Sequence, residues 1–154
     1  MSIEIERKFL VKGDFLSSVK RKEKIIQAYL CASPGKAVRV RIKGEKAYFT
    51  IKGPSNSKGF SHAEFEYEIP VSDAEEILKL CDSGFIEKER HYVEFGGHTF
   101  EVDVFHGVNE GLILAELELE SEKEPYEKPD WLGEEVTGDE RYYNAYLASR
   151  PMRS

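Results

Sequence analysis

The sequence has few of the features that mark secreted, zinc-binding or membrane proteins. Its two cysteines, Cys31 and Cys81, are far apart and outside any CxxC motif, as expected for reduced thiols in the cytoplasm. The four histidines form no HxxxH or HxH pair, which argues against zinc. No apolar run approaches the roughly 20 residues that cross a bilayer, and the first ten residues are too charged for a signal peptide. We therefore expect a cytoplasmic protein without a membrane partner.

The chain also lacks an excess of basic residues. Its 154 residues include 22 Lys and Arg against 29 Asp and Glu, a formal net charge of −7. Because nucleic-acid binding needs a net basic face, we expect no nucleic acid as a partner. The length fits a single domain over 1–154, and the 40% hydrophobic residues are enough for a core. One third of the residues are charged, so their positions decide the interpretation.

Most of the chain alternates between apolar and polar residues with the period of two that is typical of strands. Ile25–Ala32 is a candidate strand, and glycines at Gly44 and Gly96 mark tight hairpin turns between neighbouring strands. Eight antiparallel strands without long crossovers indicate either a closed barrel or a sandwich. The other seven predicted strands are Ile3–Val11, Ala37–Lys43, Lys46–Lys52, Ala63–Val71, Ile86–Phe95, Thr99–Phe105 and Leu112–Glu120.

Three helices are predicted beside the strands, which makes the fold mainly β within the α+β class. One capping box opens a helix over Asp73–Cys81, and a second opens a helix over Thr137–Ala148. A short helix is predicted at Phe15–Lys20. The segment Ser121–Gly133 combines two prolines with many charges and is predicted to be a loop.

Within each predicted strand, the charged residues occupy one face and the apolar residues the other. Half-buried strands commonly turn such a face to water, but solvent-facing surfaces usually mix the two signs with neutral polar residues. Here acids and bases are separated strand by strand, and rows of one sign suggest a ligand of the opposite sign. The bases on this face are Lys8, Arg39, Arg41, Lys43, Lys52, Lys88 and Arg90. The acids are Glu4, Glu6, Glu64, Glu66, Glu68, Glu101, Asp103, Glu116, Glu118 and Glu120.

These two sets of charges match the needs of phosphoanhydride cleavage. Basic side chains can hold a polyanion, and carboxylates bind hard cations such as Mg²⁺ or Mn²⁺ that also contact substrate phosphates. The period of two does not show whether the charged face lines the inside of a barrel or faces solvent. Both arrangements are therefore open at this point.

The segment Glu4–Lys8 is an ExExK motif, and at this position it resembles the signature of the CYTH domain family, the triphosphate tunnel metalloenzymes. Further matching motifs follow in the same order along nearly the whole chain. They are Arg39-Val40-Arg41, Thr50-Ile51-Lys52, Glu66-Tyr67-Glu68, Lys88-Glu89-Arg90, Glu101-Val102-Asp103 and Glu116-Leu117-Glu118. The first residues and the segment 134–144 are most similar to the short bacterial inorganic tripolyphosphatases of this family.

The resemblance implies a closed eight-stranded antiparallel barrel whose charged face points into a tunnel. It implies two Mg²⁺ or Mn²⁺ ions, one bridging the phosphate oxygens and one activating the attacking water. The implied triphosphate-binding residues are Lys8, Arg39, Arg41, Lys52, Lys88 and Arg90, and the implied metal ligands are Glu4, Glu6, Asp103, Glu116 and Glu118. Because the pKa of a lysine falls among cations, we also expect Lys88 to carry a proton, and we assign Lys88, Glu4 and Glu6 as catalytic.

The implied activity is hydrolysis of tripolyphosphate to pyrophosphate and phosphate, with a looser activity on nucleoside triphosphates. A class IV-type adenylyl cyclase, a thiamine triphosphatase and a non-catalytic polyphosphate-binding module are the alternatives. Relatives often have an arginine two positions before the Glu pair of the fourth charged strand, where this chain has His62 or Glu64. The roles of Glu64, Glu66 and Glu68 are therefore open, and the role of Glu101 is open as well. Because three helices cover little of a barrel, we expect a homodimer.

Overall fold

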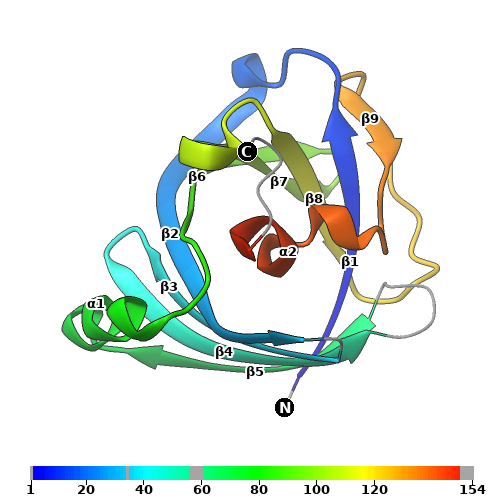
Figure 1. The fold of residues 1–154 in the computed structure, drawn as a ribbon. Helices are drawn as coiled ribbons and strands as arrows, with labels where there is room; N and C mark the ends of the chain where they lie inside the picture. Colours follow the sequence, from blue (N-terminus) through cyan, green and yellow to red (C-terminus); the bar gives the residue numbers. More distant parts are fainter. Residues whose placement is uncertain (1, 34, 56–60, 150–154) are drawn as a thin grey trace.

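The computed structural model describes residues 2–33, 35–55 and 61–149, which form one antiparallel sheet of nine strands with two α-helices (Figure 1). The strands follow the order β5-β4-β3-β2-β6-β7-β8-β1-β9, and an additional pairing of β5 with β1 closes the first eight into a barrel. The strands are β1 (Ser2–Val11), β2 (Val19–Ser33), β3 (Lys36–Lys43), β4 (Lys46–Ser55), β5 (Ser61–Ile69), β6 (Ile86–Phe95), β7 (His98–Phe105), β8 (Ile113–Leu119) and β9 (Leu132–Glu135). The predicted closed eight-stranded barrel is confirmed.

Strand β1 closes the barrel by pairing with three other strands. One edge of β1 pairs with β8 over most of its length. The other edge pairs with β5 through Ile3 and Ala63, and further along with β9 through Phe9 and Glu135. Strand β9 thus supplies partners where β5 has ended, and it begins inside the segment predicted as a loop. The predicted loop over Ser121–Gly133 is therefore wrong at its end, because an edge of β1 is available there for pairing.

Two of the three predicted helices exist as α-helices, α1 (Val71–Leu80) and α2 (Asn144–Ser149). Helix α1 has Pro70 as its N-cap and no side-chain capping bond, so the capping box predicted before Asp73 does not form. The helix predicted at Phe15–Lys20 is wrong. Only a 3-10 turn forms there, and β2 then pairs with β6 from its first residue onward.

The helix predicted over Thr137–Ala148 begins seven residues late. A 3-10 turn at Glu140–Tyr142 precedes α2, and the Asp139 side chain caps that turn by accepting from the Arg141 backbone N–H. The Thr137 hydroxyl instead accepts from the backbone N–H of Lys8 at 2.9 Å. Tertiary pairing with β1 has replaced the local capping bond that the sequence pattern predicts.

The apolar face of the barrel wall points outward and is covered by other parts of the chain. Helix α1 packs on the outside of β2, β3 and β4, with Leu78 in a cluster that includes Val40. A larger cluster contains Phe9, Phe100 and Trp131, and the loop before β9 covers it. Helix α2 lies across the opening of the barrel in Figure 1, where Leu147 packs with residues of the wall. Two of the three core clusters therefore lie outside the barrel. The third lies within one end of it beneath α2, where Ile86 and Phe105 are on the same face as Lys88 and Asp103. The charged residues of the strands occupy the rest of this inward face.

Candidate functional site: a charged cavity inside the barrel

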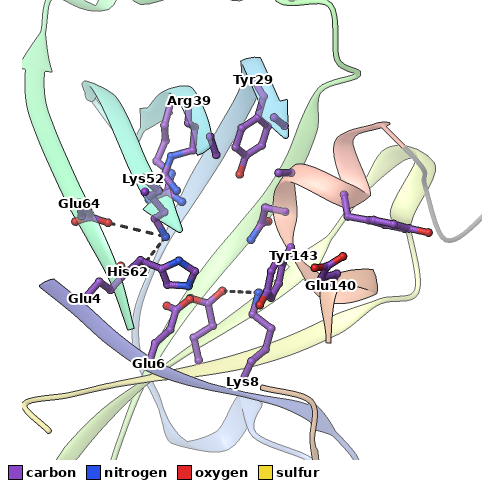
Figure 2. A pocket seen from close by; sticks show the side chains of 18 of the residues that line it. Glu4, Glu6, Lys8, Tyr29, Arg39, Lys52, His62, Glu64, Glu140 and Tyr143 are labelled. Carbon is purple, nitrogen blue, oxygen red and sulfur yellow. Dashed lines mark hydrogen bonds and ion pairs between the residues drawn. The ribbon is translucent and has the colours of Figure 1, made fainter. Parts of the chain in front are cut away.

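The interior of the barrel is a cavity of about 780 Å³ that gathers side chains from most of the strands (Figure 2). Of the eleven site residues predicted from the sequence, nine line it. These are Glu4, Glu6, Lys8, Arg39, Arg41, Lys52, Arg90, Glu116 and Glu118. The other two, Lys88 and Asp103, are fully buried in the adjoining wall. The single face on which the sequence pattern places these charges is thus one continuous inner surface.

Carboxylates from β1 and β8 lie side by side because the two strands pair in register. Glu6 is opposite Glu118, and Lys8 is opposite Glu116, with the Lys8 Nζ and Glu116 Oε1 atoms 3.6 Å apart. Burial, together with the nearby charges of Glu116 and Glu4, raises the pKa of Glu6 to about 8. Burial alone would also raise the pKa of Glu116, but Lys8 holds it well below its usual value. On this side of the cavity, carboxylates therefore outnumber the basic side chains that lie beside them.

Lys52 of β4 lies between acids of β1 and β5 at the same side of the cavity. Its Nζ is 2.7 Å from Glu4 Oε1 and 3.9 Å from Glu64 Oε2 (Figure 2). Burial would raise the pKa of Glu4, but Lys52 lowers it below its ordinary value. Burial and the charge of Glu4 together raise the pKa of Glu64 to about 7. Lys52 thus lies close to two carboxylates, and the more distant one, Glu64, has a raised pKa.

A denser cluster of ion pairs lies deeper in the wall. Asp103 Oδ1 accepts from Arg90 Nε at 2.8 Å, and its Oδ2 accepts from Arg90 Nη2 at 2.9 Å. The same Oδ2 is 2.7 Å from the Nζ of Lys88. Burial lowers the pKa of Lys88 to about 7, an effect that Asp103 opposes and the neighbouring guanidinium groups of Arg90 and Arg41 strengthen. The fall in lysine pKa that the sequence suggests is therefore present.

The C-terminal segment of the chain supplies backbone and side-chain groups that the sequence patterns do not indicate as part of the site. Lys8 Nζ donates to the backbone oxygen of Tyr142 at 3.0 Å, and Lys88 Nζ donates to Asn144 Oδ1 at 2.9 Å. The ring of Tyr143 lies 5.6 Å from Lys8 Nζ and meets the His62 ring edge-on at 6.5 Å. Because these residues precede or begin a short helix, their pattern is that of packing and capping residues.

Two further residues of the inner face come from β2. Gln27 and Tyr29 lie on the inward side of this strand, and Tyr29 lines the cavity. Neither is charged, so a search for charged rows passes over them. Their spacing of two within the candidate strand Ile25–Ala32 is the signal that could have found them.

The acidic side of the cavity has the donors that a hard divalent cation prefers. Within the described ranges, no three His, Cys, Asp or Glu side chains come close enough to one point to hold a metal ion by themselves. Glu4, Glu6, Glu116 and Glu118 nevertheless face the same space, and crowding with Glu116 and Glu4 helps to keep the pKa of Glu6 high. Mg²⁺ typically takes only a few carboxylates and completes its shell with water and substrate phosphates. The donor set therefore fits such an ion in the presence of a phosphate substrate.

Comparison with known proteins matches this architecture to one family. The family model of the CYTH domain matches residues 2–144. The chain belongs to the CYTH domain family. An inorganic triphosphatase of Acetivibrio thermocellus is 48% identical over an alignment of 155 residues, which covers 100% of this chain and 98% of that protein. An inorganic triphosphatase of Nitrosomonas europaea is 35% identical over 150 residues, which cover 94% of this CYTH chain and 96% of the relative.

The resemblance extends to a solved structure. The crystal structure of an inorganic triphosphatase superposes with a TM-score of 0.69 at 34% sequence identity. That superposition covers 96% of this CYTH chain and 95% of the other. The described part of the chain contains no helix with the length and apolar character needed to span a membrane.

Proposed function

We propose that this CYTH domain protein hydrolyses inorganic tripolyphosphate to pyrophosphate and phosphate, with a looser activity on nucleoside triphosphates. The observation that carries the proposal is the cavity itself, in which a basic set and an acidic set face each other inside one closed barrel. The names of the two relatives above, both inorganic triphosphatases, support the same activity. We further propose that the chain acts as a single domain in the cytoplasm.

The basic side chains bind and orient the polyanion. Arginine guanidinium groups suit the terminal phosphate oxygens because they donate two parallel hydrogen bonds, whereas lysines act as point charges along the chain of phosphates. In this proposal Arg39, Arg41 and Arg90 form the first kind of contact, and Lys8, Lys52 and Lys88 the second. Lys88 is also the proposed proton carrier, since its lowered pKa lets it gain and lose a proton near neutrality.

The acidic side chains hold the cofactor, which we propose to be two Mg²⁺ or Mn²⁺ ions. Such ions, when bound, supply charge neutralisation at the phosphate oxygens and acidify the attacking water. Glu4, Glu6, Glu116 and Glu118 are positioned toward the cavity for this role. Asp103 is the fifth proposed ligand, although both of its oxygens already accept from Arg90 and Lys88.

A phosphate-release assay tests this function. With Mg²⁺ or Mn²⁺ at mildly alkaline pH, we expect fast release of phosphate from tripolyphosphate, slower release from ATP and none without a divalent ion. ATP products should be analysed for cyclic AMP, whose formation would favour the cyclase alternative. Faster turnover of thiamine triphosphate than of tripolyphosphate would favour the thiamine triphosphatase. Calorimetric binding of tripolyphosphate without hydrolysis would indicate a binding module instead.

We also propose that the chain forms a homodimer through the outer face of β1 and β5. Ile3 is 61% exposed, Tyr67 is 59% exposed and Phe65 is 36% exposed, all on the outward side of these paired strands. Light scattering at micromolar concentration should give twice the chain mass of 17.6 kDa. Tyr67→Glu should yield monomers, whereas the matched change Leu80→Glu on α1 should not. A monomeric native protein would contradict the dimer.

A further inference from the structure

The chain has a single glutamine, and it is buried against the charged cavity. Gln27 is 0% exposed, although a glutamine side chain usually lies at the surface. It lies on β2, where the register places it opposite Arg41 of β3. A buried amide is tolerated only when its oxygen and nitrogen both find partners. The partners of this amide therefore indicate why it is there.

Both ends of the Gln27 amide are hydrogen-bonded to groups that face the cavity. Arg41 Nε donates to Gln27 Oε1 at 2.7 Å, and Gln27 Nε2 donates to the Tyr29 hydroxyl at 3.3 Å. A guanidinium group has donors only, so the amide oxygen must face Arg41 and the amide nitrogen must face Tyr29. One side chain thus fixes the direction of two others.

Arg41 is held by a neutral amide oxygen, whereas the neighbouring basic residues of the cavity are held by carboxylates. The neighbouring bases each lie within 4.0 Å of a carboxylate oxygen, whereas Arg41 has no such ion pair within the described residues. Its Nε is bound by a neutral oxygen, which leaves its other four N–H groups for further partners. Burial and the charge of Arg39 lower the pKa of Arg41 to about 10, so it stays protonated at neutral pH. Arg41 therefore brings a positive charge that no carboxylate of the described residues contacts directly, although Asp103 acts on it from further away.

We propose that Gln27 is a positioning residue for triphosphate binding, which holds the Arg41 guanidinium in a fixed orientation without neutralising its charge. The inference rests on the proposed function of the cavity. A glutamate has nearly the same size and could hold the same Nε, but it would form an ion pair and compete with the phosphate. The site therefore requires a side chain at residue 27 that has the shape of glutamine and carries no charge.

The substitution Gln27→Glu separates the two requirements. We expect it to raise the KM for tripolyphosphate about tenfold or more, because a charged hydrogen bond to Arg41 now competes with the substrate. The kcat should change by less than about threefold, since the groups proposed to act on water are untouched. The melting temperature should not fall. Ser17→Glu, which adds the same charge on an exposed turn outside the cavity, should leave the KM unchanged.

A second variant tests whether Gln27 acts through Arg41. Gln27→Met keeps the volume but frees the guanidinium, and we expect it to raise the KM several-fold in the native protein. In an Arg41→Met background the same change should have no effect, because the group that it positions is gone. Equal effects in both backgrounds would overturn the proposal, as would an unchanged KM in Gln27→Glu.

Failure of this inference is distinguishable from failure of the proposed function. If the native protein releases no phosphate, the proposed hydrolysis is wrong. Calorimetric binding of tripolyphosphate to the same variants then still tests Gln27, with a weakened affinity in Gln27→Glu expected and an unchanged affinity contradicting it.

Discussion

Replacing Glu6 with glutamine is expected to lower the rate of tripolyphosphate hydrolysis at least about a hundredfold. Glu6 is a proposed metal ligand, and the loss of such a ligand removes several kcal/mol of transition-state stabilisation. The fold should tolerate the change. The pKa of Glu6 is raised to about 8 by burial and by Glu116 and Glu4, so without metal the side chain is mostly protonated at neutral pH. A glutamine amide resembles that neutral form. Phosphate release at saturating Mg²⁺ and Mn²⁺ measures the loss, and thermal unfolding in a chelator measures the fold.

The pH dependence of the same variant gives an independent check. The pKa of Glu6 is higher in the folded chain than in the unfolded chain, so its contribution to stability is full below pH 4.5 and is lost as the pH rises through about 8. The metal-free native protein should lose stability over this range, and Glu6→Gln should lose less. Glu87→Gln, an exposed acid outside the cavity, is the matched control and should behave as the native protein. Native turnover in Glu6→Gln would contradict the proposed role.

Asp103→Asn is expected to destabilise the protein by about 3–5 kcal/mol, the usual cost of removing one partner from a buried ion pair. Asp103 is 1% exposed and accepts from Arg90 through both oxygens, and Lys88 shares one of them. An asparagine would leave the buried Lys88 and Arg90 without their nearest carboxylate, and Arg90 would keep the longer contact with Glu101. For a chain of this size the melting temperature should fall by about 6–20 °C, which calorimetry would measure.

The outcome also distinguishes two roles for Asp103. A large fall in melting temperature in the presence of a chelator identifies it as the counter-ion of Lys88 and Arg90. An unchanged melting temperature with weaker Mg²⁺ binding would instead favour the role of metal ligand. Glu101→Gln is the matched control, because Glu101 contacts Arg90 at 3.5 Å but is 28% exposed, and it should cost less than about 1 kcal/mol.

The barrel could be predicted from the sequence because each of its strands carries its own signal. The alternation of charged and apolar residues gives both the strands and the shared face, and the hairpin glycines Gly44 and Gly96 take the positive φ that tight turns require. What the pattern could not give is which face turns inward, since alternation is identical for a barrel lined with charges and a sandwich coated with them. Family resemblance supplied that choice, and the positions of α1 and Trp131 on the outer face confirm it.

The parts of the site that escaped prediction depend on contacts between distant segments. Thr137 has the local pattern of a capping residue, but its hydroxyl binds the backbone of Lys8, more than a hundred residues away. The sequence pattern places Asn144 within a helix, but its side-chain oxygen accepts a hydrogen bond from Lys88. Local propensity is a weak guide where tertiary partners compete for the same polar group. The neutral residues Gln27 and Tyr29 escaped for a different reason, because charge patterning does not register them.

The threefold pairing of β1 has a consequence for the order of folding. Its partners lie far along the chain, since Lys8 pairs opposite Glu116 and Phe9 opposite Glu135, whereas β3, β4 and β5 are joined as successive hairpins. Contacts between residues so distant carry a high cost in loop entropy and form late. The strand that bears Glu4, Glu6 and Lys8 is synthesised before its partner strands and stays unpaired until they are present. A partly folded chain in which β1 is still unpaired therefore has an incomplete site, because Glu4, Glu6 and Lys8 have not reached the charged residues of the other strands.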